Sequence, residues 1–154
     1  MTGFGKSNRI LKKVDFDAVM NSAASRSSAH RAKSVEPSSK RTPGNFVPAV
    51  KVVCPAFIIF AKPTDTELAS TPSSSRLGLV VSRKVGNSPR RNLVKRIARE
   101  NFRLAVLEAG TGRAADWVIL ARPEAGQLTR AELTNAVKTC IGRLQRRLQE
   151  KVAG

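Results

Sequence analysis

The sequence predicts an α+β sandwich in which helices pack against a small mixed sheet of four strands. Three observations lead to this prediction. Four short runs are rich in β-branched and other apolar residues, and two long segments repeat their apolar residues at three- and four-residue steps. The chain has 154 residues, of which 41% are apolar, and this length and content suit one domain with one core.

The first predicted element is a short helix that ends at Met20. Asp15 is a good N-cap, and Phe16, Val19 and Met20 are apolar at helical spacing. The composition then changes over residues 22–48, which hold seven serines, three prolines and five basic residues. Such a segment buries too little apolar surface to fold by itself, so we expect a flexible, positively charged insertion within the single domain 1–154.

Three strands follow the insertion, and a fourth comes after the next helix. Pro55 marks a turn, a bulge or an edge between the first two strands. A loop rich in Ser, Thr and Pro over residues 63–75 precedes the third. The predicted strands are Val50–Cys54, Ala56–Ala61, Leu77–Val81 and Trp117–Ala121.

The last helix is marked by a capping box, in which Thr129 is followed three residues later by Glu132. Its apolar stripe consists of Leu133, Ala136, Val137, Cys140, Ile141, Leu144 and Leu148. Five cations lie off that stripe, namely Lys138, Arg143, Arg146, Arg147 and Lys151. Two interpretations stay open for them: a solvated helix end, where the helix dipole favours cations, or a nucleic-acid surface.

The net charge of the chain is +17, from 28 Lys and Arg against 11 Asp and Glu. Such an excess is tolerable when a polyanion or an acidic membrane is the usual neighbour. No run of 18 uncharged apolar residues and no secretory signal pattern is present, so we expect a cytoplasmic protein with no membrane partner and no small-molecule substrate. Cys54 and Cys140 lack metal-ligand spacing and are expected to be buried, reduced thiols. Since the chain carries this positive charge and a membrane is disfavoured, nucleic acid is the leading partner.

The helix before the fourth strand carries the most concentrated charge. Ser88 can cap it, Pro89 suits its first position, and it is expected to extend to about Leu107. At about 100° per residue, one arc of roughly 140° holds Arg91, Asn92, Lys95, Arg96, Arg99 and Arg103. The opposite arc holds Leu93, Val94, Ile97, Ala98, Leu104 and Ala105.

This charge pattern is unfavourable for a helix without a partner. Arg91, Lys95 and Arg99 are like charges at four-residue steps, and Arg90 adds a cation at the helix N-terminus, where the dipole disfavours it. Bound anions would relieve both costs. The pattern leaves DNA and RNA open, although a helix-turn-helix protein would be mostly helical, and here strands flank the helix.

The stretch RLGLVVSRKVGNSPRRNLVKRIARENFR, residues 76–103, resembles the signature region of the bacterial ribonuclease P protein component. The matching residues are Gly78, Val81, Ser82, Lys84, Val85, Gly86, Asn87, Arg91, Asn92, Lys95, Arg96, Arg99, Glu100, Phe102 and Arg103. The resemblance extends to RILKKVDFDAVM, DWVILARP and LTRAEL. The chain departs from the family at Leu93, where a basic residue is common, at Met20, where an aromatic is common, and in the long insertion.

The resemblance implies a two-layer α/β sandwich with a left-handed β-α-β crossover. It implies that the chain is the protein subunit of ribonuclease P. This endoribonuclease removes the 5′ leader of precursor tRNA and leaves a 5′ phosphate on the tRNA. The chemistry is expected in the RNA subunit, with Mg²⁺ held by RNA and substrate, and no catalytic or metal-binding residue is expected in the protein. The expected partners are ribonuclease P RNA and precursor tRNA.

The residues expected to bind RNA are Arg83, Lys84, Asn87, Arg90, Arg91, Asn92, Lys95, Arg96, Arg99 and Arg103. Phe16, Lys12 and Lys13 are the candidates for binding the leader, because an aromatic face stacks on any base. Packing in the core under the sheet is nearly as good an interpretation of Phe16. The insertion is either an unstructured loop or a cationic segment that folds onto RNA.

Two other functions are alternatives to this one. A general RNA-binding or ribosome-associated protein of similar fold would share the charge but not the signature. A protein-only nuclease is disfavoured because His30, in the insertion, is the one histidine and no carboxylate cluster is evident.

Overall fold

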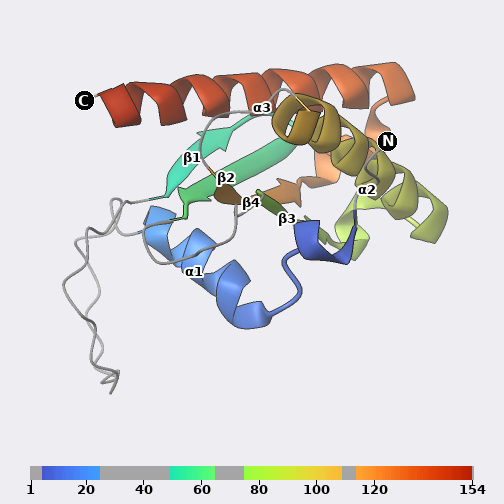
Figure 1. The fold of residues 1–154 in the computed structure, drawn as a ribbon. Coiled ribbons are helices and arrows are strands. Elements are labelled where there is room, and N and C mark those ends of the chain that lie inside the picture. The colour runs from blue at the N-terminus through green and yellow to red at the C-terminus, as the bar shows by residue number, and fades with distance from the viewer. Residues whose placement is uncertain (1–4, 25–48, 65–74, 109–113, 154) are drawn as a thin grey trace, which may run out of the picture.

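The computed structural model describes residues 5–24, 49–64, 75–108 and 114–153 (Figure 1). Its centre is a sheet of β1 (Val50–Val53), β2 (Phe57–Pro63), β3 (Arg76–Val81) and β4 (Ala115–Ala121), in the order β1-β2-β4-β3. β2 is antiparallel to β1 and β4, whereas β3 and β4 are parallel neighbours joined through a helical crossover. The predicted mixed four-stranded sheet is confirmed.

One face of the sheet is covered by α2 (Ser88–Phe102) and α3 (Arg130–Ala153). Alternate residues of each strand point to this face and form the main core, as the two-residue period of a strand requires. Trp117 of β4 is 1% exposed and meets Phe102 of α2 edge to face, with 5.8 Å between ring centroids. The predicted stripe of α3 is confirmed, since Leu133, Val137 and Leu144 are fully buried.

The other face carries α1 (Lys13–Ala24), on the opposite side of the sheet from α3 (Figure 1). A smaller apolar cluster, formed by Ile10, Val19 of α1, Phe60 of β2 and Val118 of β4, lies between this helix and the sheet. Helices therefore lie on both faces, within the α+β class that the sequence predicts. Asp15 is not the N-cap: the helix begins at Lys13, because the N–H groups of residues 15 and 16 bond to the carbonyl of residue 12.

The capping box of α3 forms as predicted. The Thr129 N–H donates to Glu132 Oε2 (2.7 Å), and the Glu132 N–H donates to Thr129 Oγ1 (3.3 Å). The hydrogen bond from the Thr129 backbone, and then that of the Thr129 side chain, hold the pKa of the Glu132 carboxyl below its ordinary value of 4.5, because hydrogen bonds to a carboxylate favour its ionised form.

A pH dependence of stability follows from this cap. A group whose pKa is lower in the folded state stabilises the fold above its unfolded pKa, and the gain is lost as pH falls through the folded pKa. Glu132→Gln mimics the protonated form. We expect the wild type to melt above this variant at pH 7, and the gap to close as pH falls below 4.5. A gap that stays constant down to pH 3 would contradict the role of the ionised carboxylate.

The end of the second helix differs from the prediction. After Phe102 the chain continues as a π-helix over Arg103–Glu108. This wider turn shifts the angular position of the residues that follow. Leu104, expected in the core, is 42% exposed, while Val106 is 3% exposed and packs in the core.

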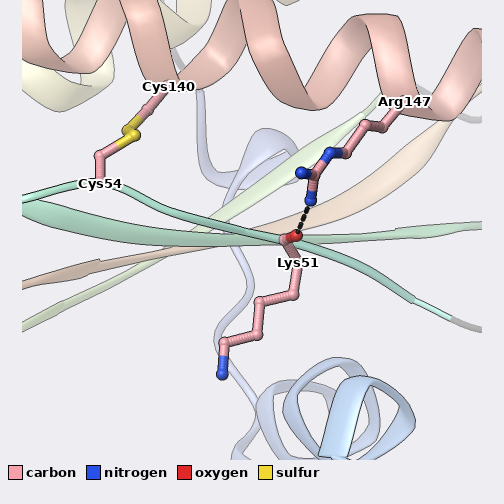
Figure 2. The surroundings of a disulfide bond; sticks show 4 residues. All are labelled: Lys51, Cys54, Cys140 and Arg147. Atoms are coloured by element: carbon pink, nitrogen blue, oxygen red, sulfur yellow. Dashed lines mark hydrogen bonds between the residues drawn. A yellow bond between two sulfur atoms is a disulfide. The ribbon is translucent and has the colours of Figure 1, made fainter. Parts of the chain in front are cut away.

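The expectation of two reduced thiols is wrong in this structure. Cys54, just after β1, and Cys140 of α3 are both buried, as expected, but they form a disulfide with their Cα atoms 6.4 Å apart (Figure 2). This separation lies within the range that a disulfide bridges. A second link ties the same elements, because Arg147 Nη1 donates to the Lys51 carbonyl (3.0 Å). The Lys51 side chain points away from α3, and its Nζ lies 5.6 Å from the centre of the Phe60 ring (Figure 2).

Two predicted loops lie largely outside the described residues. Within the predicted insertion 22–48, residues 22–24 belong to α1. Residues 25–48, which include His30, are not described. Of the predicted loop 63–75, Pro63 ends β2 and residues 65–74 are not described. Within the described ranges, no helix is both long and apolar enough to cross a membrane.

Candidate nucleic-acid interface

The basic helix α2 begins at a turn that only glycine makes easily. Gly86 has φ of 148° and follows a short 3₁₀ turn, Arg83–Val85. The next residue, Asn87, is extended, and its side-chain oxygen accepts from the Arg90 N–H (3.1 Å). Asn87 is therefore the N-cap in place of the predicted Ser88, and the helix starts one residue earlier than expected.

We define the α2 cationic face as Arg91, Asn92, Lys95, Arg96 and Arg99. Asn92 and Arg96 are exposed, and the other three are half-buried. Among the residues that the structure describes, none of the four cations forms an ion pair with a carboxylate. Arg83 and Lys84 are also exposed and extend the charge to the start of the helix. The stripe that the sequence predicts thus exists as a surface.

Arg91 lies where this face meets the core. Its Nη2 donates to Ser88 Oγ (3.1 Å), while its Nε is buried without a hydrogen-bond partner among the described atoms. An unsatisfied buried donor costs about 1–3 kcal/mol. A shift of the guanidinium onto an anion would recover that cost.

Arg103 is the exception on the predicted cationic arc. Its Nη2 lies 2.7 Å from Glu100 Oε1, three residues earlier on the same helix. This bond lowers the pKa of Glu100. An RNA contact by Arg103 stays a prediction, and it would compete with this ion pair.

Arg90 has a structural role that the sequence did not reveal. Its guanidinium donates to the carbonyls of Gly126 (2.9 Å), Ala125 (3.4 Å) and Leu128, which lie in and after the 3₁₀ turn Pro123–Gln127. These donors already serve the fold. The RNA contact of Arg90 stays a prediction.

Gly126 makes this close packing possible. A Cβ there would lie 1.9 Å from the Val85 carbonyl oxygen, whereas a Cβ at Gly142, on the exposed side of α3, would meet nothing within 4 Å. We expect Gly126→Ala to destabilise the fold by about 1–3 kcal/mol through overpacking. The matched variant Gly142→Ala is expected to stabilise it by about 0.5–1 kcal/mol, because alanine loses less entropy in a helix. Urea denaturation measures both, and equal effects of the two would contradict this account of the contact.

Arg9 lies beside the α2 cationic face and was not predicted. Its backbone forms a parallel bridge with Leu77, the second residue of β3. Burial, and then the charge of Arg9, lower the pKa of Arg99. The two like charges are thus near enough to interact, and no helical period could have revealed a pair 90 residues apart.

The face of the sheet that carries α1 has a second feature. Val53, Ile58, Leu120 and Val80 are partners in register across the four strands, and each is at least partly exposed. We call these four residues the apolar strip. Val53 is 54% exposed. The sequence did not reveal the strip because β2 reads FIIFA, which is apolar on both faces.

The three leader candidates lie near this face. Lys12 and Lys13 are exposed where α1 begins. Phe16 is half-buried over Gly78 of β3, where a Cβ would come within 2.4 Å of its ring. Packing against the sheet is therefore a role of Phe16, and its stacking on a base stays a prediction.

The comparisons with known proteins agree on one family. The ribonuclease P family model matches residues 4–145. A ribonuclease P protein component from Saccharophagus degradans is 31% identical over 131 residues, which is 84% of this chain and 72% of that protein. One from Dehalococcoides mccartyi (strain CBDB1) is 37% identical over 91 residues, 59% of this chain and 68% of that protein. For other relatives the matched segment spans about half of their length, as with 53% of the Exiguobacterium sp. protein.

The solved structures support the fold. The RNase P protein of Staphylococcus aureus has a TM-score of 0.61 to this chain at 23% identity, and the match covers 89% of this chain and 94% of that one. A second structure of the protein from this organism gives a TM-score of 0.57 at 21% identity, with 94% of each chain covered.

Proposed function

This chain belongs to the ribonuclease P protein family, and from that premise we propose that it binds the catalytic RNA of ribonuclease P through α2 and assists removal of the 5′ leader from precursor tRNA. The α2 cationic face carries the proposal. It gathers four cations on one side of a helix whose other side is fixed in the core. Phosphates of an RNA would neutralise that charge and release counterions, which is the main source of affinity for nucleic acids.

We propose that the RNA performs the hydrolysis and that Mg²⁺ is held by RNA and substrate. The carboxylates of Asp15 and Asp116 both bind Arg76, so they are engaged in ion pairs. Within the described residues, no three His, Cys, Asp or Glu side chains gather to hold a metal. The protein would supply affinity and position, and bound Mg²⁺ would activate the attacking water and stabilise the leaving oxygen.

The apolar strip favours a single-stranded leader as the second ligand. Bases of a single strand are unpaired and can pack on apolar side chains, while the phosphates meet cations. The strip provides the first kind of contact, and Lys12, Lys13 and Lys51 provide the second kind around α1 and β1. We place this activity in the cytoplasm, where precursor tRNA is made in bacteria.

Reconstitution tests the proposed function. Purified protein is mixed with a bacterial ribonuclease P RNA at low Mg²⁺, and cleavage of precursor tRNA is followed. We expect cleavage that needs the RNA and is stimulated by the protein. Binding without stimulation would favour a general RNA-binding protein, and cleavage by the protein alone would favour a nuclease.

A further inference from the structure

The segment that leads into α1 is attached to β3 before the helix begins. The Asn8 side chain donates to the Ser75 carbonyl (3.4 Å), and the Ile10 N–H donates to the Leu77 carbonyl (3.0 Å). These bonds run along the outer edge of β3. They form the first anchor of the segment.

A second anchor lies in the first turn of α1. Arg76 of β3 binds Asp116 of β4 through Nε (2.8 Å) and Nη2 (2.6 Å), and its Nη1 reaches Asp15 (3.3 Å). The next residue of α1, Phe16, lies over Gly78. Arg76 and Gly78 are two residues apart on one strand and so point to the same face. Consecutive residues of α1 thus dock onto alternate residues of β3.

The four residues between these anchors project into solvent. Leu11 is 72% exposed and Val14 is 75% exposed, and Lys12 and Lys13 between them are also exposed. Two ammonium groups flanked by two apolar side chains match the phosphates and bases of a single strand. A turn fixed at both ends loses little entropy when it binds a ligand.

We propose that Arg76 is a positioning residue for the 5′ leader: by holding Asp15 against Asp116, it fixes the turn that presents Lys12 and Lys13. This inference rests on the proposed function. Arg76 itself does not touch the leader. The Arg76–Asp15 pair contributes little to stability, because both side chains are about one third exposed, at 35% and 32%. Its role is the placement of the turn.

The test compares substrates with and without a leader. Complexes of catalytic RNA with wild-type protein or Asp15→Asn are assayed for affinity to precursor tRNA and to mature tRNA. Asp15→Asn removes the negative charge that pairs with Arg76 in the first turn of α1, while leaving the bidentate Arg76–Asp116 pair in place. We expect it to reduce the preference for precursor over mature tRNA by roughly three- to tenfold, which lies in the lower part of the range for couplings between neighbouring residues. Affinity for mature tRNA and for the catalytic RNA should not change.

Two further sets of variants identify the cause. Glu124→Gln removes the ion pair with Arg122, which lies outside α1 and β3, and should leave the preference unchanged. In a background of Lys12→Ala with Lys13→Ala, Asp15→Asn should have no additional effect, because its action passes through those lysines. Arg76→Lys keeps one cation between the two carboxylates, so this variant should retain part of the wild-type preference for precursor tRNA.

Several results would overturn the inference. Equal losses for precursor and mature tRNA would show a general structural defect, and an additive loss in the lysine background would show that Asp15 acts by another route. A wild-type complex with no preference for precursor would instead refute the proposed leader binding itself. Melting temperatures of each variant establish that the proteins compared are folded.

Discussion

Replacing Arg91, Lys95 and Arg99 together by glutamine should weaken binding to ribonuclease P RNA about a hundredfold at 0.15 M salt. Each phosphate contact releases a counterion worth roughly 0.7 log units of affinity at that salt, and three contacts would be lost. Glutamine keeps much of the half-buried aliphatic stem and has good helix propensity, so the fold should persist. Filter binding or fluorescence anisotropy measures the affinity, and circular dichroism checks the fold.

A second set of cations on the same chain provides the matched control. Lys138, Arg143 and Arg146 are exposed on α3, and their replacement by glutamine removes the same charge. Arg147 is left in place because it binds the Lys51 carbonyl. We expect less than about a threefold loss, because exposed charges beyond the Debye length are screened. Equal losses in the two triple variants would mean that net charge, and not the α2 cationic face, determines binding. That result would favour the nucleic-acid interpretation of the α3 cations.

Reducing the Cys54–Cys140 disulfide should lower the free energy of unfolding by about 4–5 kcal/mol, which corresponds to a fall of about 10 °C or more in melting temperature. The bond joins residues 86 apart in the sequence, and closing so long a loop removes much of the entropy of the unfolded chain. It also attaches β1, which lies at the edge of the sheet formed by the described strands, to α3. Thermal unfolding with and without a reductant measures the effect.

The double variant Cys54→Ala with Cys140→Ala is the control for this experiment. Its melting temperature should lie at or slightly below that of the reduced wild type, and reductant should not change it. Mass spectrometry of the native oxidised protein should show two fewer hydrogen atoms than the reduced form has. Two titratable thiols in the native protein, together with a melting temperature that reductant leaves unchanged, would refute the bond.

The two long helices could be predicted because burial on one side imposes a helical period. The capping box at Thr129 and Glu132 could also be predicted, since the partners are three residues apart. The exposure of Leu104 could not be predicted, because the π-helix changes the helical period within one turn. The same limit applied to the start of α2, where the conformation of Gly86 moves the cap to Asn87.

Features that depend on contacts between distant residues could not be predicted from the sequence. The cysteines showed no spacing that indicates a bond, and the approach of β1 to α3 brings them together. Arg90 was expected to bind RNA, but its guanidinium donates to carbonyls that lie 35–38 residues further on. The resemblance identified the family and the surface, whereas Arg76 and the apolar strip became evident only once the strands were in register.

The dependence of RNA affinity on salt tests the central claim most directly. If the α2 cationic face and its neighbours neutralise about six phosphates, a plot of log affinity against log salt should have a slope near −4 to −5 for the wild type. The variant lacking the charges of Arg91, Lys95 and Arg99 should give a slope shallower by about 2–3. A wild-type slope near −1, or a slope that the variant leaves unchanged, would contradict the assignment of this helix as the RNA-binding surface.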